Sequence, residues 1–140
     1  MFEGTGFYRT TAILQKALGA ASLRHTVISD NIANVDTPNY KRQFVRFEEY
    51  LKKYLHPQPP AVILKRTDPR HITNWHEPSL EEVKPRIDVE IDTNYRNDRN
   101  NVDIDTEMVE LVKNQLKYNA MAQLEAQHFR FIDDILRKAR

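Results

Sequence analysis

Residues 30–42, DNIANVDTPNYKR, decide how the chain is divided. Before them, apolar residues recur at helical spacing. This pattern has to stop at Pro38, because proline lacks an amide hydrogen and turns the preceding residue away from helical dihedrals. Asn39 follows at a position that suits a left-handed turn, which asparagine adopts more readily than other non-glycine residues. We call residues 30–42 the joint and predict a polar helix end, a turn and a basic exit, with no catalytic group.

The segment before the joint predicts a long helix that begins near Thr10 or Thr11, either of which can cap it. Its apolar residues follow steps of three, four and seven, a pattern that favours an amphipathic helix with a coiled-coil seam. Gly19 costs such a helix about 1 kcal/mol relative to alanine, so the helix needs a partner. The stripe consists of Leu14, Ala17, Leu18, Ala21, Ile28, Ile32 and Val35.

The last third of the chain predicts a second long helix, which begins near Asp103 or Asp105 and continues to about residue 138. At 1.5 Å per residue it would run about 50 Å, more than a compact domain of this size needs. We expect it to pair antiparallel with the first helix and to leave apolar surface over for self-association. Its stripe consists of Met108, Leu111, Val112, Leu116, Tyr118, Met121, Ala122, Phe129, Ile132, Ile135 and Leu136.

The centre is predicted to be irregular, because all seven prolines lie between Pro38 and Pro85. It contains a predicted short helix from Phe44 to the residues before Pro57, a short buried strand at residues 61–64, and an exposed loop at residues 94–101. Residues 86–92 alternate as a strand does, with three apolar residues on one face and three solvated carboxylates on the other. These residues are Ile87, Val89 and Ile91, and Asp88, Glu90 and Asp92.

The fold class is therefore mainly α. Two long terminal helices are expected to pair as a coiled-coil-like hairpin around a Pro-rich centre with minor β structure. We predict one structural domain with three segments: an N-terminal helical segment (1–37), a central region (38–101) and the C-terminal helix (102–140).

The composition excludes several classes of function. With 21 basic and 20 acidic residues, the net charge of +1 supplies no field for nucleic acid or an anionic membrane. The chain has no cysteine, no glycine-rich phosphate loop, and no apolar run of the ~20 residues that span a bilayer. His71 and His76 beside Trp75 give only a weak metal signal. Residues 98–109 lack the glycine and the final glutamate of a calcium loop. We predict no enzyme, no cofactor and no small-molecule substrate.

Residues 31–41, NIANVDTPNYK, resemble the N-terminal signature of the bacterial flagellar rod, hook and hook-associated axial proteins. Residues 66–72 (RTDPRHI), 100–105 (NNVDID) and 113–120 (KNQLKYNA) are similar to motifs of the proximal rod members. The family usually has glycine where this chain has Asn39 and Arg99. The signature residues are Asn31, Ile32, Ala33, Asn34, Val35, Thr37, Pro38 and Tyr40.

The resemblance implies a structural subunit of the basal-body rod that assembles helically in the periplasm, transmits torque and lines the export channel. It also implies export by the flagellar type III apparatus without a cleaved signal peptide, and the N-terminus lacks the pattern of such a signal. The implied partners are copies of itself, other rod proteins and the adaptor that links the rod to the membrane ring.

The residues predicted to pack between protomers belong to both helical stripes, and for each the core of an ordinary intramolecular hairpin is about as good a reading. An alternative function is a soluble helical adaptor or chaperone that binds a partner's helix in a groove. A hydrolase or metal enzyme would need a convergent site that the sequence does not show. The predicted packing residues are Leu14, Leu18, Ala21, Ile28, Met108, Leu111, Phe129 and Ile132.

Overall fold

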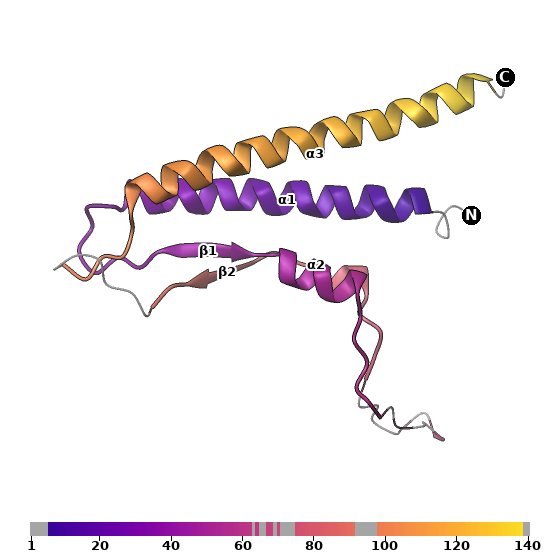
Figure 1. Cartoon of the computed structure of the whole chain (residues 1–140), viewed down its shortest axis with the longest axis horizontal. Helices are drawn as coiled ribbons and strands as arrows, with labels where there is room; N and C mark the ends of the chain where they lie inside the picture. Colours follow the sequence, from indigo (N-terminus) through magenta and orange to yellow (C-terminus); the bar gives the residue numbers. More distant parts are fainter. Residues whose placement is uncertain are drawn as a thin grey trace.

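The computed structural model describes residues 6–62, 64, 67–68, 70, 75–91 and 98–138. In these ranges the chain is mainly helical, as predicted (Figure 1). Two long helices from the ends of the chain lie together, and a small two-stranded sheet lies in the centre. The elements are α1 (Gly6–Ala33), β1 (Gln43–Arg46), α2 (Glu48–Leu55), a 3₁₀ turn η1 (Leu80–Glu82), β2 (Arg86–Val89) and α3 (Ile104–Lys138).

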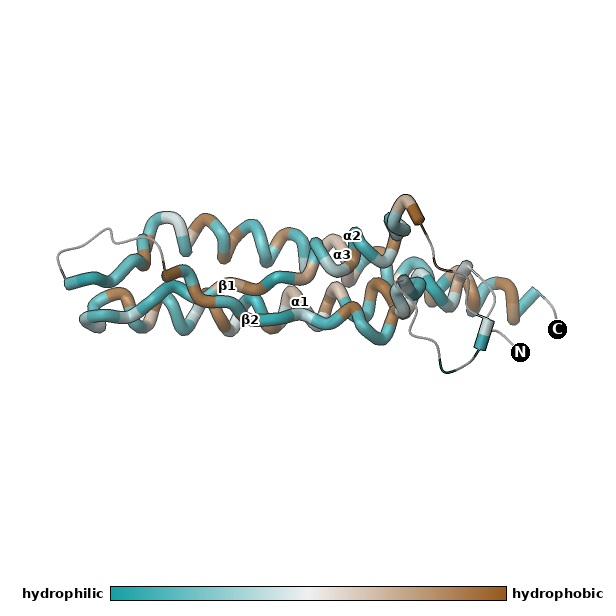
Figure 2. The backbone as a smooth tube through the Cα atoms, turned by 90° about the horizontal axis from the view of Figure 1, so that it is seen from below, coloured by the Kyte–Doolittle hydropathy of each residue, from teal (hydrophilic) through white to brown (hydrophobic). Residues whose placement is uncertain are grey.

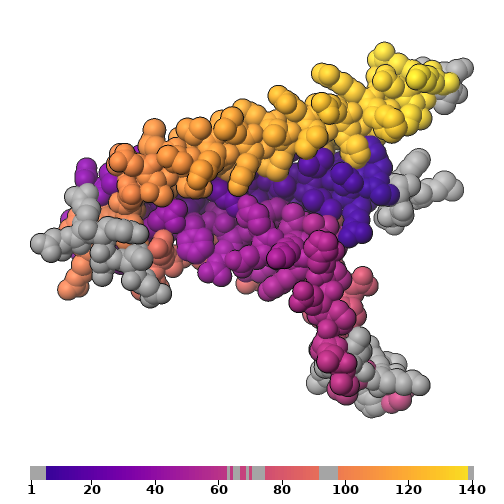
Figure 3. Space-filling view, in the orientation of Figure 1, coloured from indigo at the N-terminus to yellow at the C-terminus, as the bar shows by residue number. Residues whose placement is uncertain are grey.

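The pairing of α1 with α3 is antiparallel and holds at both ends of the hairpin. Near the joint, Asn31 of α1 bonds Glu107 of α3. At the far end, the rings of Phe7 and His128 stack 3.8 Å apart. The two-stranded sheet and α2 pack along the other side of α1, so that α1 lies between α3 and the sheet (Figures 1 and 3).

The helix starts show which polar residues act as caps. α1 begins at Gly6 rather than at Thr10 or Thr11, because the Thr10 hydroxyl donates back to the Gly6 carbonyl at 2.8 Å and so lies inside the helix. α3 begins at Ile104, as predicted, with Asp103 as its cap: one carboxylate oxygen accepts the Asp105 amide at 3.0 Å.

The apolar core lies between α1 and the central region. Ala20 of α1 is buried against Phe47 and Val83, and Tyr50 and Leu51 of α2 pack around them. The α1–α3 seam is different, because the buried residues of α3 are Glu107, Asn114 and Glu125. Figure 2 shows hydrophilic and hydrophobic residues alternating along both helices. The hairpin forms as predicted, but its seam is partly polar.

The centre differs from the prediction at its start. Phe44 lies in β1, not in a helix, and α2 begins only at Glu48. The predicted strand at residues 61–64 is wrong for the positions described: Ala61, Val62 and Leu64 are exposed and belong to no strand, and residue 63 lies outside the described residues.

Residues 86–89 form a strand as predicted, but its apolar face is the more exposed of the two. β2 pairs antiparallel with β1, with Val45 opposite Ile87. The apolar side chains of Ile87 and Val89 are about half exposed. Asp88 is less exposed, because its carboxylate pairs with Arg46 at 2.8 Å. The carboxylates expected to be solvated are thus those that make ion pairs; Asp92 lies outside the described residues.

Candidate functional site: a polar joint between hairpin and centre

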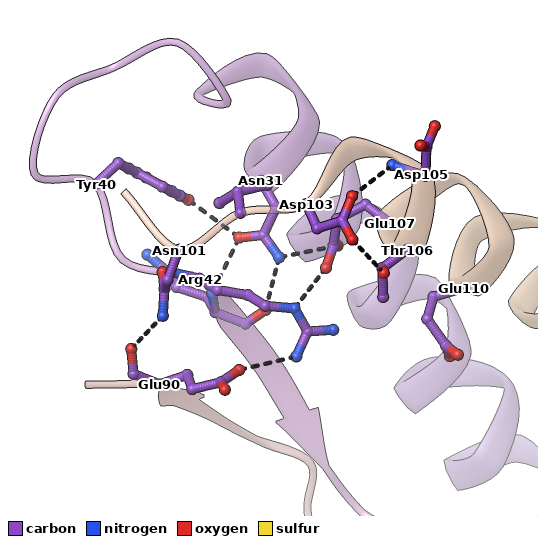
Figure 4. Close-up of polar contacts among 12 residues, drawn as sticks. Asn31, Tyr40, Arg42, Glu90, Asn101, Asp103, Asp105, Thr106, Glu107 and Glu110 are labelled. Atoms are coloured by element: carbon purple, nitrogen blue, oxygen red, sulfur yellow. Dashed lines mark hydrogen bonds and ion pairs between the residues drawn. The ribbon is translucent and has the colours of Figure 1, made fainter. Parts of the chain in front are cut away.

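The joint ends against a cluster of polar side chains contributed by α1, the start of β1 and the start of α3 (Figure 4). Asn31, fully buried, is at its centre. Its amide accepts the Gln43 backbone N–H at 3.0 Å and donates to the Gln43 carbonyl at 2.7 Å, as a neighbouring strand would. The same amide nitrogen donates to Glu107 at 3.0 Å. Asn31 thereby fixes the exit of the chain from α1 into β1.

Asn101 extends the β1–β2 ladder by one step. Its side-chain oxygen accepts the Arg42 amide at 2.6 Å, and its nitrogen donates to the Glu90 carbonyl at 2.8 Å. Beside it, the Glu90 amide donates to the Arg42 carbonyl at 2.9 Å. The segment that leads into α3 is therefore attached to both strands at once.

An ion pair between Arg42 and Glu107 joins the central region to α3. The Arg42 Nε donates to the Glu107 carboxylate at 2.5 Å, and a second guanidinium nitrogen reaches Glu90 at 3.2 Å. Glu107 is fully buried. Burial acts to lower the pKa of Arg42, but the hydrogen bonds and charges of Glu107 and Glu90 outweigh it and raise that pKa. Breaking a buried pair by removing one partner typically costs about 3–5 kcal/mol.

Tyr40 covers the cluster from the joint. Its hydroxyl lies 3.3 Å from the Asn31 side-chain oxygen, to which it donates. Burial raises the pKa of Tyr40, and the carboxylates of Asp30 and Glu107 raise it further. The hydroxyl therefore stays protonated and remains a donor at neutral pH.

Asn100 closes the turn after α1. Its side-chain nitrogen lies 2.9–3.0 Å from three carbonyl oxygens, those of Asn34, Val35 and Thr37. Two of these carbonyls also accept a backbone N–H within the turn, that of Asn34 at 3.0 Å and that of Thr37 at 3.3 Å, and Asn100 adds a donor from the segment that leads into α3. The prediction that residues 94–101 form an exposed loop is therefore wrong at Asn100 and Asn101, which are 0% and 1% exposed; residues 94–97 lie outside the described residues.

Two residues of the joint region have left-handed backbone conformations. Asn39 has φ 60° and Arg99 has φ 62°. They belong to segments that contact each other, since the Asn39 amide donates to the Asp98 carbonyl at 3.0 Å. The left-handed turn predicted at Asn39 is confirmed. Glycine, which the family resemblance implies at both positions, takes this conformation without steric cost.

The remaining signature residues belong to the turn itself and lie outside the buried polar cluster. Ile32 and Val35 are partly buried, whereas Ala33 and Pro38 are exposed. The exposed Thr37 hydroxyl bonds the Asn34 side chain at 3.3 Å. The predicted signature residues all lie in the last turns of α1 or in the joint: Asn31, Ile32, Ala33, Asn34, Val35, Thr37, Pro38 and Tyr40.

The predicted packing residues fall into three groups. Ala21 and Ile28 are buried within the chain itself, and Met108 and Phe129 are about half exposed. The rest are partly buried: Leu14, Leu18, Leu111 and Ile132.

Sequence reasoning did not assign the partners of the signature residues. Arg42, Asn100 and Asn101 lie in the motifs quoted above and Glu107 lies just after one of them, but nothing local to these residues indicates that they meet. The signal in the sequence is the recurrence of amide and charged residues just before a helix start.

The cluster has the chemistry of a structural connection. The cavity beside Arg42 has a volume of about 190 Å³, whereas small-molecule sites usually begin at about 300 Å³. Within the described ranges, no three His, Asp or Glu side chains gather as metal ligands would; His71 lies outside these ranges. None of the described helices is long and apolar enough to cross a bilayer.

Comparison with known proteins, both with a family model and with individual relatives, points to one class of structural protein. A family model described as "Flagella basal body rod protein" matches residues 13–41. Flagellar basal body rod protein FlgB of Borreliella burgdorferi is 36% identical over 132 residues, covering 94% of this chain and 98% of that protein. The FlgB proteins of Bacillus subtilis and Salmonella typhimurium are 37% and 31% identical, covering 84% and 74% of this chain and 84% and 75% of those proteins.

A helical hairpin with a structural polar joint, similar over most of its length to rod proteins, defines a structural subunit of the flagellar basal-body rod. Within that class, the chain belongs to the FlgB family of flagellar basal body rod proteins. This confirms the family resemblance. The rod function is favoured over the alternative of a soluble adaptor or chaperone.

Proposed function

We propose that the chain builds the rod through head-to-tail contacts between copies of itself and with other rod proteins. Such heterologous contacts propagate into an open helical polymer, whereas a two-fold contact would close. The assembled helices would form the wall of the tube, line its export channel and transmit torque. No catalytic step, cofactor, nucleic acid or small-molecule substrate is needed for this role.

The observation that supports this proposal is an apolar stripe on α3 that the chain itself leaves uncovered. We call this stripe the outer face of α3. It follows helical spacing on the side of α3 away from Glu107 and Asn114, which face α1. Large contiguous apolar surfaces of this kind mark protein interfaces. The outer face consists of Ile104, Met108, Val109, Val112 and Leu116, which are 45–64% exposed.

The joint would carry force between the hairpin and the central region. Arg42, Asn101 and Glu107 tie β1 and β2 to the start of α3, and Asn31 ties β1 to α1. A load applied to the central region would thus reach both helices at one place. In this proposal the segments 1–37, 38–101 and 102–140 act as one structural unit.

The proposed partners follow from a place in the rod. They are copies of the chain, other rod proteins, the adaptor that joins the rod to the membrane ring, and the type III export apparatus, which would deliver the chain to the periplasm without a cleaved signal peptide.

A gene deletion tests this role directly. In the bacterium that encodes the chain, loss of the gene should abolish the rod in purified basal bodies and stop export of the hook protein, and the intact gene should restore both. Normal rods and hook protein export in the deletion strain would refute the proposal.

A further inference from the structure

The seam between α1 and α3 contains a buried carboxylate that makes no hydrogen bond. Glu125 is 9% exposed, and neither of its carboxylate oxygens has a partner in the part of the chain that the structure describes. Glu107, the other buried glutamate of α3, is paired with Arg42. Burying an ionised carboxylate without a partner is strongly unfavourable. Glu125 therefore opposes the closing of the helices around it.

Two basic side chains in the N-terminal half of α1 are engaged away from the seam. On α1, Arg9 lies over the Tyr54 ring at 4.9 Å and Lys16 donates to the Val83 carbonyl at 3.2 Å, so both are directed to the central region. On α3, His128 lies one turn further on in the same seam. Its Nδ1 lies 3.1 Å from the Thr11 hydroxyl.

The end of the hairpin beyond Glu125 is held by a small latch. His128 stacks on Phe7 and contacts Thr11, which joins the first turns of α1 to α3. Between this latch and the joint, Asn114 donates to the Ala21 carbonyl at 2.8 Å but leaves its own side-chain oxygen without a partner. The hairpin is thus firmly tied at the joint and weakly tied at its free end.

We infer that the free end of the hairpin, residues 6–18 and 118–138, opens while the joint stays closed, and that the unpaired Glu125 carboxylate sets this opening. Opening brings the carboxylate into water and separates α1 from α3 along this part of the seam. Such local opening is common where few contacts hold an element. A further step, in which a second copy of the chain enters the opened seam, rests on the proposed function.

Hydrogen exchange on the full-length chain at neutral pH tests the opening. Some of the variants should slow exchange at the free end, and another should speed it. Glu125→Gln removes the charge and Glu125→Leu also fills the site with an apolar side chain. Both should slow exchange in residues 118–138 by about tenfold or more, because the closed form gains stability. His128→Ala should speed exchange there. Residues 104–114, next to the joint, should be unchanged in all three, and Asp134→Asn, which removes an exposed carboxylate of α3, should match the original chain.

Exchange that is unchanged or faster in both Glu125 variants would overturn the inference, and so would unchanged exchange in His128→Ala. The link to assembly has a separate readout. If opening serves assembly, Glu125→Leu lowers the amount of the chain in rods. Slowed exchange together with normal rods would refute this link alone and would leave the role as a rod subunit, which the gene deletion tests, in place.

Discussion

Asparagine side chains close the joint by acting as backbone substitutes. A primary amide carries a donor and an acceptor side by side, as a peptide group does. Asn31 uses both on the backbone of Gln43, and Asn101 uses them on Arg42 and Glu90. Aspartate would lack the donor and glutamine would be longer by one methylene. Asparagine is therefore the residue that makes both hydrogen bonds at each of these two positions.

Asn100→Ala should destabilise the chain. The carbonyl oxygens of Asn34, Val35 and Thr37 lose their hydrogen bonds from this buried amide, which should cost about 1–3 kcal/mol although two of the three keep a backbone donor. Urea unfolding followed by circular dichroism measures the change in the free energy of unfolding. Asn119→Ala, at an exposed position of α3, is the control and should change it by less than about 0.5 kcal/mol. Equal effects of the two substitutions would contradict the role of Asn100.

Arg99→Gly should stabilise the chain by about 0.5–1 kcal/mol, because an arginine at φ 62° bears a steric cost that glycine avoids. Asn39→Gly should have a smaller effect, since asparagine tolerates this conformation. Both can be measured as shifts of the urea midpoint at constant slope. A loss of stability in Arg99→Gly would show that its side chain makes a contact worth more than the strain.

At the scale of elements, the features that could be predicted are those that depend only on residues close together in the sequence. The period of both long helices follows from apolar spacing, and the structure confirms the start of α3 to within a residue of Asp103 and Asp105, whereas α1 begins four residues before the predicted cap at Thr10. Burial could not be predicted in this way. The carbonyls that Asn100 binds lie 63–66 residues earlier in the chain, and a loop of polar residues otherwise looks solvated.

The helix start of α3 should depend on pH through Asp103. Its hydrogen bond to Thr106 lowers the pKa of Asp103; burial opposes this, and the backbone amides of Asp105 and Thr106 lower the pKa further. A carboxyl group whose pKa is lowered on folding stabilises the fold above its unfolded pKa, and this stabilisation is lost as the pH falls through the folded value.

Asp103→Asn keeps the cap but removes this titration, because asparagine is also a good capping residue. Thermal unfolding from neutral pH to below the ordinary value of 3.8 should therefore show a smaller decrease of Tm in the variant than in the original chain. Parallel pH profiles for the two proteins would exclude this contribution of Asp103.

At the scale of the whole molecule, many apolar residues lie on the surface of the isolated subunit, where they contribute little to its stability. The core between α1 and the central region is small, and the α1–α3 seam holds three buried polar residues of α3. Meanwhile the outer face of α3 is open to solvent. This distribution suits a chain that completes its packing in an assembly, as a rod subunit does.

A charge on the outer face should prevent assembly without unfolding the subunit. Val112→Asp and Leu116→Asp place a carboxylate where we propose that another subunit packs, and burying it there would be costly. Rods in purified basal bodies should be lost, while circular dichroism of the isolated chain stays unchanged. Thr26→Asp, an exposed position of α1, is the matched control. Rods formed normally by both outer-face variants would place the interface elsewhere.

The most direct test of assembly through the outer face is the thiol reactivity of Leu116→Cys in the isolated subunit and in intact rods. The chain has no cysteine of its own, so the new thiol is the only one measured. Leu116 is 64% exposed in the subunit, and a maleimide reagent should modify the cysteine there rapidly. In purified basal bodies the thiol should be protected, and it should react once the rods are dissolved. Equal reactivity in intact rods and in the isolated subunit would contradict the account.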